Sequence, residues 1–153
     1  MFLVAYDGSP AANLALHHAA ALVGPGGEVA VINVFPVQSV SSRLETVSDR
    51  ERSRQAGLLH DAELQLRRHG IEPRMIAAAG DPATEILAAA EATNAGTIVV
   101  GRSHRRHLMH GPLASKLVRR AHCDVLVVGS GSSSTGGAGD DRQAEPLRDA
   151  SLT

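Results

Sequence analysis

The sequence is poor in aromatic residues. Two phenylalanines and one tyrosine make up 2% of its 153 residues, and tryptophan is absent. A core must therefore be built from Ala, Val, Leu and Ile. Proteins that hold single-stranded nucleic acid stack its bases on aromatic side chains. The sequence offers almost none, so nucleic acid is not an expected partner.

Disulfides and long apolar runs are missing as well. Cys123 is the only cysteine, so an intramolecular disulfide cannot form. No apolar run approaches the roughly 18–20 residues that a membrane span needs. The sequence starts directly on the apolar residues 2–5, with no charged leader or secretory apolar region. These features predict a cytoplasmic protein in a reducing compartment, with no membrane partner. The length suits one domain.

Acidic residues are absent from one segment, although the whole chain is nearly balanced with 15 basic and 16 acidic residues. This basic segment, residues 102–120, leaves nine basic residues against sixteen acidic ones elsewhere. A local excess of cations predicts a local anionic partner. Its cations are Arg102, Arg105, Arg106, Lys116, Arg119 and Arg120.

Two apolar runs, residues 97–101 and 125–128, flank the basic segment and show no alternation with polar residues. Runs of this kind are typical of parallel strands buried on both faces. A buried strand that ends in glycine and enters a basic loop before a helix is a common arrangement for holding phosphate. Further strands are predicted at 2–6, 29–35 and 73–79, and helices at 10–23, 46–69, from 82 onward and at 112–121.

The predicted order alternates strand and helix throughout, which indicates an α/β fold with a doubly wound, five-stranded parallel sheet. Ser9-Pro10 and Asp81-Pro82 are helix start signals, each a capping residue followed by proline. The helical spacing of apolar residues predicts inward-facing positions. In the first helix these include Leu16 and Leu22, and in the last they are Leu113, Leu117, Val118 and Ala121.

Residues 130–153 form a Gly/Ser-rich and then mildly acidic tail. Such a composition buries too little apolar surface to offset the entropy of ordering, so the tail is expected to be disordered. The predicted domain is residues 1–129.

Three histidines in the basic segment, His104, His107 and His110, are spaced at i, i+3 and i+6. That spacing brings side chains toward one helical face, and imidazole is a common metal ligand. No acidic residue or cysteine adjoins them, however, and the neighbouring cations repel a metal ion. A solvated or anion-facing loop is the expectation, and no metal site is predicted.

Several short motifs together resemble the universal stress protein family over nearly all of residues 2–128. They are VAYDGS at 4–9, NV at 33–34, GDPA at 80–83, IVVG at 98–101 and AHCDVLVV at 121–128. The resemblance implies a flavodoxin-like or Rossmann-like fold of the nucleotide-binding α-hydrolase-like kind. It also implies a regulatory or sensing module in a stress response, often a homodimer built through the last strand, with ATP or another adenine nucleotide bound by some members.

The resemblance also implies roles for individual residues. An acidic residue after the first strand, Asp7 here, contacts the base or ribose, and the residue at Val34 lines the adenine pocket. The phosphates lie on a loop that reads Gly, two residues, Gly, nine residues, Gly, then Ser or Thr. The nucleotide-binding residues implied are Asp7, Val34, Val100, Gly101, Arg102, His104, Arg105 and Gly111.

This loop departs from the family pattern, because His104 replaces its middle glycine. With the spacing kept, the closing pair is Ala114-Ser115, which retains the hydroxyl but leaves less than two turns for the last helix. With three residues missing, the pair is Gly111-Pro112, which keeps a normal helix. The second alignment is preferred because the apolar stripe that begins at Leu113 needs the helix.

A second reading is an interaction protein that binds no nucleotide and docks an acidic partner through the basic loop and helix, residues 102–120. An enzymatic role is not expected. The sequence has no Ser-His-Asp, Cys-His or paired-carboxylate arrangement, and no P-loop pattern of Gly, four residues, then Gly-Lys-Ser/Thr. A weak ATPase ranks last among the alternatives.

Overall fold

The computed structural model describes residues 1–37, 49–102 and 113–129. Strands and helices alternate through these residues in the order predicted, and most of their ends lie within one residue of the prediction. The predicted tail, 130–153, lies outside the described part. The elements are β1 (Phe2–Ala5), α1 (Pro10–Val23), β2 (Val29–Pro36), α2 (Asp49–Arg68), β3 (Arg74–Gly80), α3 (Pro82–Ala92), β4 (Thr97–Gly101), α4 (Leu113–Arg120) and β5 (Asp124–Val128).

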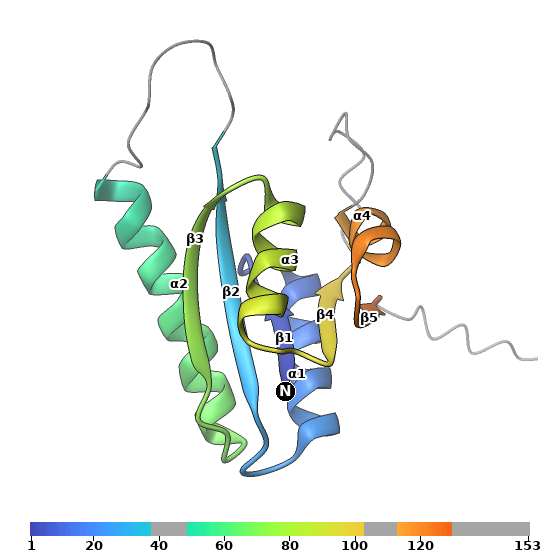
Figure 1. The fold of residues 1–153 in the computed structure, drawn as a ribbon. Helices are drawn as coiled ribbons and strands as arrows, with labels where there is room; N and C mark the ends of the chain where they lie inside the picture. Colours follow the sequence, from blue (N-terminus) through green and yellow to red (C-terminus); the bar gives the residue numbers. More distant parts are fainter. Residues whose placement is uncertain (38–48, 103–112, 130–153) are drawn as a thin grey trace, which may run out of the picture.

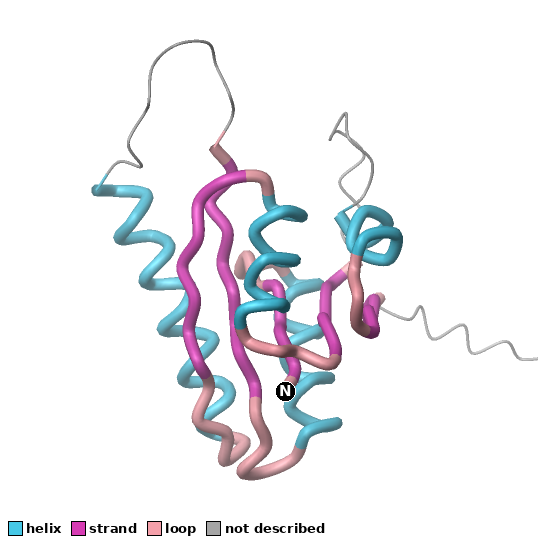
Figure 2. Tube along the Cα trace, viewed as in Figure 1, coloured by secondary structure: helices cyan, strands magenta, loops and turns pink. Residues whose placement is uncertain are grey.

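All five strands are parallel and are arranged in the order β3-β2-β1-β4-β5 (Figure 1). The chain moves outward from the central strand β1 to β3, and α3 then carries it back to β4 on the other side of β1. Helices α1 and α2 cover one face of the sheet, and α3 and α4 cover the other (Figure 2). The doubly wound parallel sheet predicted from the sequence is confirmed.

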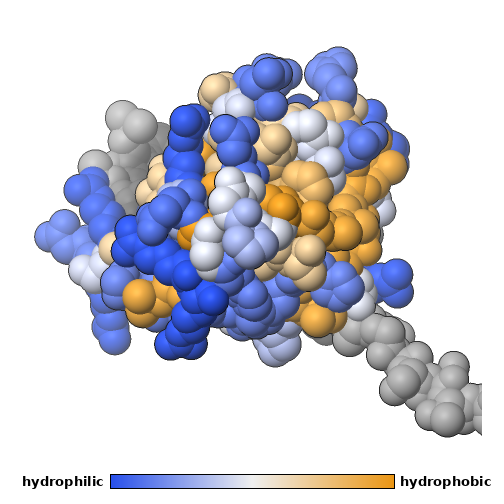
Figure 3. Space-filling model, turned by 90° about the horizontal axis from the view of Figure 1, so that it is seen from below, coloured by the Kyte–Doolittle hydropathy of each residue, from blue (hydrophilic) through white to orange (hydrophobic). Residues whose placement is uncertain are grey.

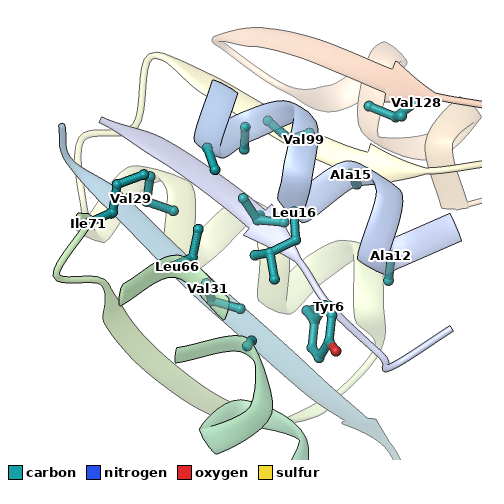
Figure 4. Packing of buried hydrophobic residues seen from close by; sticks show 14 of the residues in the cluster. Tyr6, Ala12, Ala15, Leu16, Val29, Val31, Leu66, Ile71, Val99 and Val128 are labelled. Atoms are coloured by element: carbon teal, nitrogen blue, oxygen red, sulfur yellow. The ribbon is translucent and has the colours of Figure 1, made fainter. Parts of the chain in front are cut away.

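Each face of the sheet has its own apolar cluster, because successive strand residues point to opposite faces. Val4, Val31 and Val99 pack against α1 and α2 with Leu16 and Leu66 (Figure 4). The other face carries Leu3, Ile32, Ala83, Ile86, Ile98 and Leu117. Among the buried core residues of the described part, Tyr6 is the only aromatic one, so the core is aliphatic as the composition requires.

Two apolar residues that the helical spacing placed inward are exposed. Leu22, in the last turn of α1, is 63% exposed, and Val118 is 58% exposed. Val118 follows the fully buried Leu117, and successive residues of a helix point about 100° apart. Because Leu117 occupies the buried face of α4, Val118 points toward the solvent. The prediction that Leu22 and Val118 face inward was therefore wrong.

The last strand is also less buried than the sequence predicted. Val125, Leu126 and Val127 are only half-buried, whereas Ile98, Val99 and Val100 in β4 are buried. The reason is position: β4 lies between two strands, but β5 pairs with β4 alone and forms an edge. An apolar run without alternation thus identified the strand correctly and its burial incorrectly.

No helix among the described residues combines the length and apolar character needed to cross a membrane.

Candidate functional site

The candidate site lies where the order of strands reverses, between β1 and β4. In doubly wound sheets ligands bind outside the carboxyl ends of the strands at this point, because the two following connections leave toward opposite faces. Here α1 follows β1 on one face, and the chain after β4 leads to α4 on the other. Beyond the last paired residues, Ala5 and Val100, the chain continues to Asp7 and Arg102.

The turn from β1 into α1 carries Asp7, an exposed carboxylate. Its Oδ1 accepts a hydrogen bond from the Ser9 backbone N–H at 2.9 Å. Ser9 in turn caps α1, since its Oγ accepts from the Ala12 N–H at 3.2 Å. Gly8 between them has a φ of 77°, a conformation that glycine adopts without strain. The turn is thus built to hold Asp7 at the carboxyl edge of the sheet.

Gly101, at the end of β4, lies directly under the first turn of α1. A Cβ placed on Gly101 would overlap the Ala11 carbonyl group and come within 2.8 Å of the Ala12 backbone nitrogen. These are backbone atoms, which cannot rotate out of the way as a side chain can. Glycine at this position therefore allows α1 to approach β4, a packing role that is independent of any ligand.

The predicted site residues within the described part lie on three adjacent strands. Asp7 follows β1, and Val34 on β2 and Gly101 on β4 flank it on either side. Val34 is half-buried, whereas Val100 is 4% exposed and packs in the cluster beneath α3 and α4. The structure therefore brings Asp7, Val34 and Gly101 to one edge and gives the Val100 side chain a place in the core.

Arg102 lies toward β5. Its backbone N–H donates to the Val128 carbonyl at 2.7 Å, and a Cβ on Gly129 would be 3.2 Å from the Arg102 Cζ. The guanidinium therefore lies over Gly129, at the β5 side of the edge.

Three of the predicted nucleotide-binding residues, His104, Arg105 and Gly111, lie outside the described residues, as do His107 and His110. Helix α4 begins at Leu113, as the alignment with Gly111-Pro112 expects. The alternative pair, Ala114-Ser115, falls inside the first turn of this helix.

Sequence reasoning missed a polar network behind the β1–α1 turn. The Tyr6 hydroxyl donates to Asn13 Oδ1 at 2.9 Å, and Gln65 Nε2 from α2 donates to the same oxygen at 3.2 Å. Asn33, the buried polar residue of β2, donates from Nδ2 to the Tyr6 carbonyl at 2.7 Å. The one available signal was Asn33 itself, a polar residue that interrupts an apolar strand.

Burial raises the pKa of the Tyr6 hydroxyl above its usual value of 10.0. The hydrogen bond from Gln65 opposes this rise, and the charges of Asp61 and Asp7 add to it. The hydroxyl therefore stays protonated at neutral pH and acts as the donor to Asn13.

Two open cavities lie away from the reversal point. One of about 420 Å³ lies between α2 and β3, where Gln55, Leu59 and Ala78 contribute to its lining. The other, of about 380 Å³, is at the amino ends of β1 and β2. Neither of these two is lined by Asp7, Val34 or Gly101.

Within the described ranges, no group of three His, Cys, Asp or Glu residues is placed to hold a metal ion.

Asp81 caps α3 at the same edge of the sheet and provides a test of the local structure. Its carboxylate accepts from the Thr84 N–H at 3.0 Å and from the Thr84 hydroxyl at 2.9 Å. These bonds, the backbone one first, lower the pKa of Asp81 below 3.8, and the charges of Lys116 and Arg120 add to the effect. The N-cap of α3 thus favours the ionised form of Asp81.

We expect Asp81→Ala to reduce the free energy of unfolding by about 1 kcal/mol at pH 7, as is typical for loss of an N-cap. Because folding lowers the pKa, this stabilisation is complete above the unfolded value and is lost as the pH falls through the folded one. Urea unfolding at pH 7 and near pH 3 measures both effects. Asp81→Ser keeps the cap without a titrating group, so it should retain stability at pH 7 and lose less on acidification. An equal loss of stability between pH 7 and pH 3 in the parent and in Asp81→Ser would contradict the assignment.

A family model described as "Universal stress protein family" matches residues 1–129. The chain therefore belongs to the universal stress protein family, as its motifs indicated. A comparison with curated proteins finds no match.

Solved structures support the same fold. Universal stress protein UspA from Lactobacillus plantarum matches with a TM-score of 0.71 and 19% identity, over 83% of this chain and 95% of that one. A family member from Arabidopsis thaliana with AMP bound matches with a TM-score of 0.65 and 17% identity, over 84% and 90%. A universal stress protein in complex with cAMP matches with a TM-score of 0.64 and 22% identity, over 83% and 94%. At these identities the likeness shows the fold alone.

Proposed function

We propose that this protein binds an adenine nucleotide at the carboxyl ends of β1, β2 and β4 and acts as a regulatory module of the stress response. The observation that carries the proposal is the placement of Asp7. An exposed carboxylate stands on a built turn at the point of strand reversal, with Val34 and Gly101 on the neighbouring strands. A carboxylate accepts hydrogen bonds from ribose hydroxyls or the base, and a half-buried valine suits the face of adenine.

Ligands of the structural relatives support the same class. One relative of this fold is described with AMP bound and another in complex with cAMP. ATP is the ligand expected from the sequence, and AMP and cAMP share its adenosine moiety. Arg102 provides positive charge for phosphate on the β5 side of Asp7. The proposed role is binding without turnover, in which occupancy changes the surface offered to a partner.

The proposal predicts that millimolar Mg-ATP raises the melting temperature of the purified protein. A ligand at about 100 times its dissociation constant adds roughly 2.7 kcal/mol, or about 5–10 °C for a domain of this size. AMP, cAMP and inorganic phosphate, tested separately, show whether the adenosine or the phosphate is recognised. A shift with phosphate alone would contradict an adenine site.

Two Asp7 variants and one control test the site. Asp7→Asn can still accept from the Ser9 N–H, so we expect its unliganded melting temperature to be kept and its ATP-dependent rise to be lost. Asp7→Ala also loses the hydrogen bond from the Ser9 N–H, so we expect a lower unliganded melting temperature as well as loss of the ATP-dependent rise. Glu91→Ala removes an exposed carboxylate from α3 and should leave the rise intact. ATP-dependent phosphate release that Asp7→Ala stops would instead indicate an ATPase.

We also propose a homodimer formed through β5. This strand pairs on one side only, and its residues Val125, Leu126 and Val127 are half-buried. Figure 3 shows a broad apolar area on its right-hand side, the side on which β4 and β5 lie in Figure 1. Soluble proteins rarely leave such an edge open, because it invites pairing with another chain.

The proposed compartment is the cytoplasm, where a lone cysteine stays reduced.

A second candidate function is docking of an acidic partner that needs no nucleotide. The observation in its favour is α4, where the exposed Val118 is followed by Arg119 and Arg120, both exposed. Within the described residues, no ion pair engages Lys116, Arg119 or Arg120. Absence of any nucleotide-dependent shift, together with a partner that is lost when Arg105 and Arg106 are neutralised, would favour this function.

A further inference from the structure

Helix α2 contacts the turn that carries Asp7, although none of its residues was predicted to belong to the site. Leu58 lies against Gly8, where an added Cβ would be 2.5 Å from the Leu58 Cδ2. Two helical turns further on, Gln65 reaches the polar network of β1 and α1. A third side chain, Gln55, donates to the backbone carbonyls of Asn33 on β2 and Ala78 on β3, at 2.8 and 2.9 Å. Gln55, Leu58 and Gln65 thus link α2 to the strands β2 and β3 and to the β1–α1 region that carries Asp7.

The network fixes the turn from both ends. Asn13 Nδ2 donates to the Gly8 carbonyl at 3.4 Å, one residue after Asp7. Asn33 Nδ2 donates to the carbonyl of Tyr6, one residue before Asp7. The orientation of the Asn13 amide follows from its other partners, because its Oδ1 accepts from both the Tyr6 hydroxyl and Gln65.

Gln65 completes the arrangement from α2. Its Nε2 lies 3.2 Å from Asn13 Oδ1 and 3.4 Å from the Tyr6 hydroxyl, so it bridges the two groups. Figure 4 shows the Tyr6 ring among the buried residues, with its hydroxyl oxygen in red. In such partly buried networks each member limits the freedom of the others. No buried side-chain N or O among the described residues lacks a hydrogen-bond partner.

We infer that Gln65, Asn13 and Tyr6 are positioning residues that hold the Asp7 turn in its ligand-binding geometry and couple it to α2. This inference rests on the proposed nucleotide site. A ligand that contacts Asp7 acts on the turn between Tyr6 and Gly8, and Gln65 passes any displacement of that turn to α2. Conversely, the position of α2 sets how well the turn is ordered before the ligand arrives, and pre-ordering increases affinity.

Tyr6 supplies a direct optical readout, because the chain has one tyrosine and no tryptophan. Its fluorescence therefore reports this network without interference from other residues. Nucleotide binding should change the Tyr6 signal in a saturable manner. In Gln65→Leu the amplitude of this change should fall, because the hydroxyl has lost its link to α2.

The decisive experiment compares nucleotide affinity, by calorimetry, with stability in four proteins: the parent, Gln65→Leu, Tyr6→Phe and Thr93→Val. We expect Gln65→Leu and Tyr6→Phe to bind roughly three- to ten-fold more weakly, in line with the loss of one hydrogen bond. Thr93→Val is the matched control. It removes a half-buried hydroxyl that donates to the Ala89 carbonyl at 2.7 Å, at the far end of α3, so it should cost stability without changing affinity.

A purely structural network would behave differently. If Gln65→Leu and Tyr6→Phe lower the melting temperature as Thr93→Val does but bind nucleotide as tightly as the parent, the inference is wrong while the proposed function stands. If the parent gives neither heat nor a Tyr6 signal with ATP, AMP or cAMP, the proposed function fails and the coupling to a ligand fails with it. Amide hydrogen exchange in residues 7–13 separates the two failures, because it should rise in Gln65→Leu even without ligand.

Discussion

Replacement of Gly101 by alanine will cost about 3 kcal/mol of the free energy of unfolding. Overpacking usually costs 1–3 kcal/mol, and this case belongs at the upper end because the atoms met are the backbone of Ala11 and Ala12. The first turn of α1 must move away from β4, and the cap at Ser9 and the packing of Ala12 and Ala15 move with it. Urea unfolding measures the loss, which corresponds to roughly 6–12 °C in melting temperature.

Gly57→Ala is the control for this substitution. Gly57 lies within α2, and an added Cβ there meets nothing within 4 Å. The same chemical change should therefore stabilise the protein by about 0.5–1 kcal/mol through helix propensity. A Gly101→Ala protein as stable as the parent would show that α1 does not need this close approach. Because Gly101 variants are expected to disturb the fold, Asp7 is the better residue for testing the proposed nucleotide site.

Leu117→Ala will produce the second large effect. Leu117 is fully buried, and it is the buried residue of the eight-residue helix α4. Removing a buried leucine side chain typically costs 2–5 kcal/mol. When detachment of α4 alone costs less than global unfolding, the loss appears first as local opening. Urea unfolding combined with hydrogen exchange of residues 113–121 distinguishes the two forms of the loss.

Val118→Ala is its control, one residue along the same helix. Val118 is 58% exposed, so we expect a change of at most about 0.5 kcal/mol. Equal losses at the two positions would mean that α4 does not pack through Leu117. A stable Val118→Ala protein also allows the docking function to be tested, since an apolar contact with a partner would be weakened without harm to the fold.

The fold was predictable because its signals are local. Residues 97–101 form a strand in the predicted range, and Ser9-Pro10 and Asp81-Pro82 start helices where expected. Apolar runs, caps and glycine turns operate over a few residues, so one sequence suffices to read them. The errors at Leu22, Val118 and β5 have a different origin, since burial depends on which neighbours the folded chain supplies.

The candidate site was predictable only in part, because some of its residues are brought together only by the folded chain. Asp7, Val34 and Gly101 were predicted from family motifs, and the structure places them at the carboxyl ends of three adjacent strands. The network behind them joins residues far apart in sequence: Asn33 is 27 residues from Tyr6, and Gln65 is 52 from Asn13 and 59 from Tyr6. No spacing rule links such positions. The packing role of Gly101 was hidden likewise, because its partner is the backbone of another element.

The central place of β1 has a consequence for how the chain folds. One edge of β1 pairs with β2, which follows it closely, but the other edge pairs with β4, which is made much later. During synthesis, β1, β2 and β3 can associate while the second edge of β1 still lacks its partner. Non-local pairing of this kind slows folding and leaves an apolar edge open to other chains. The junction between β1 and β4, where the candidate site lies, therefore forms only after β1, β2 and β3 have been made.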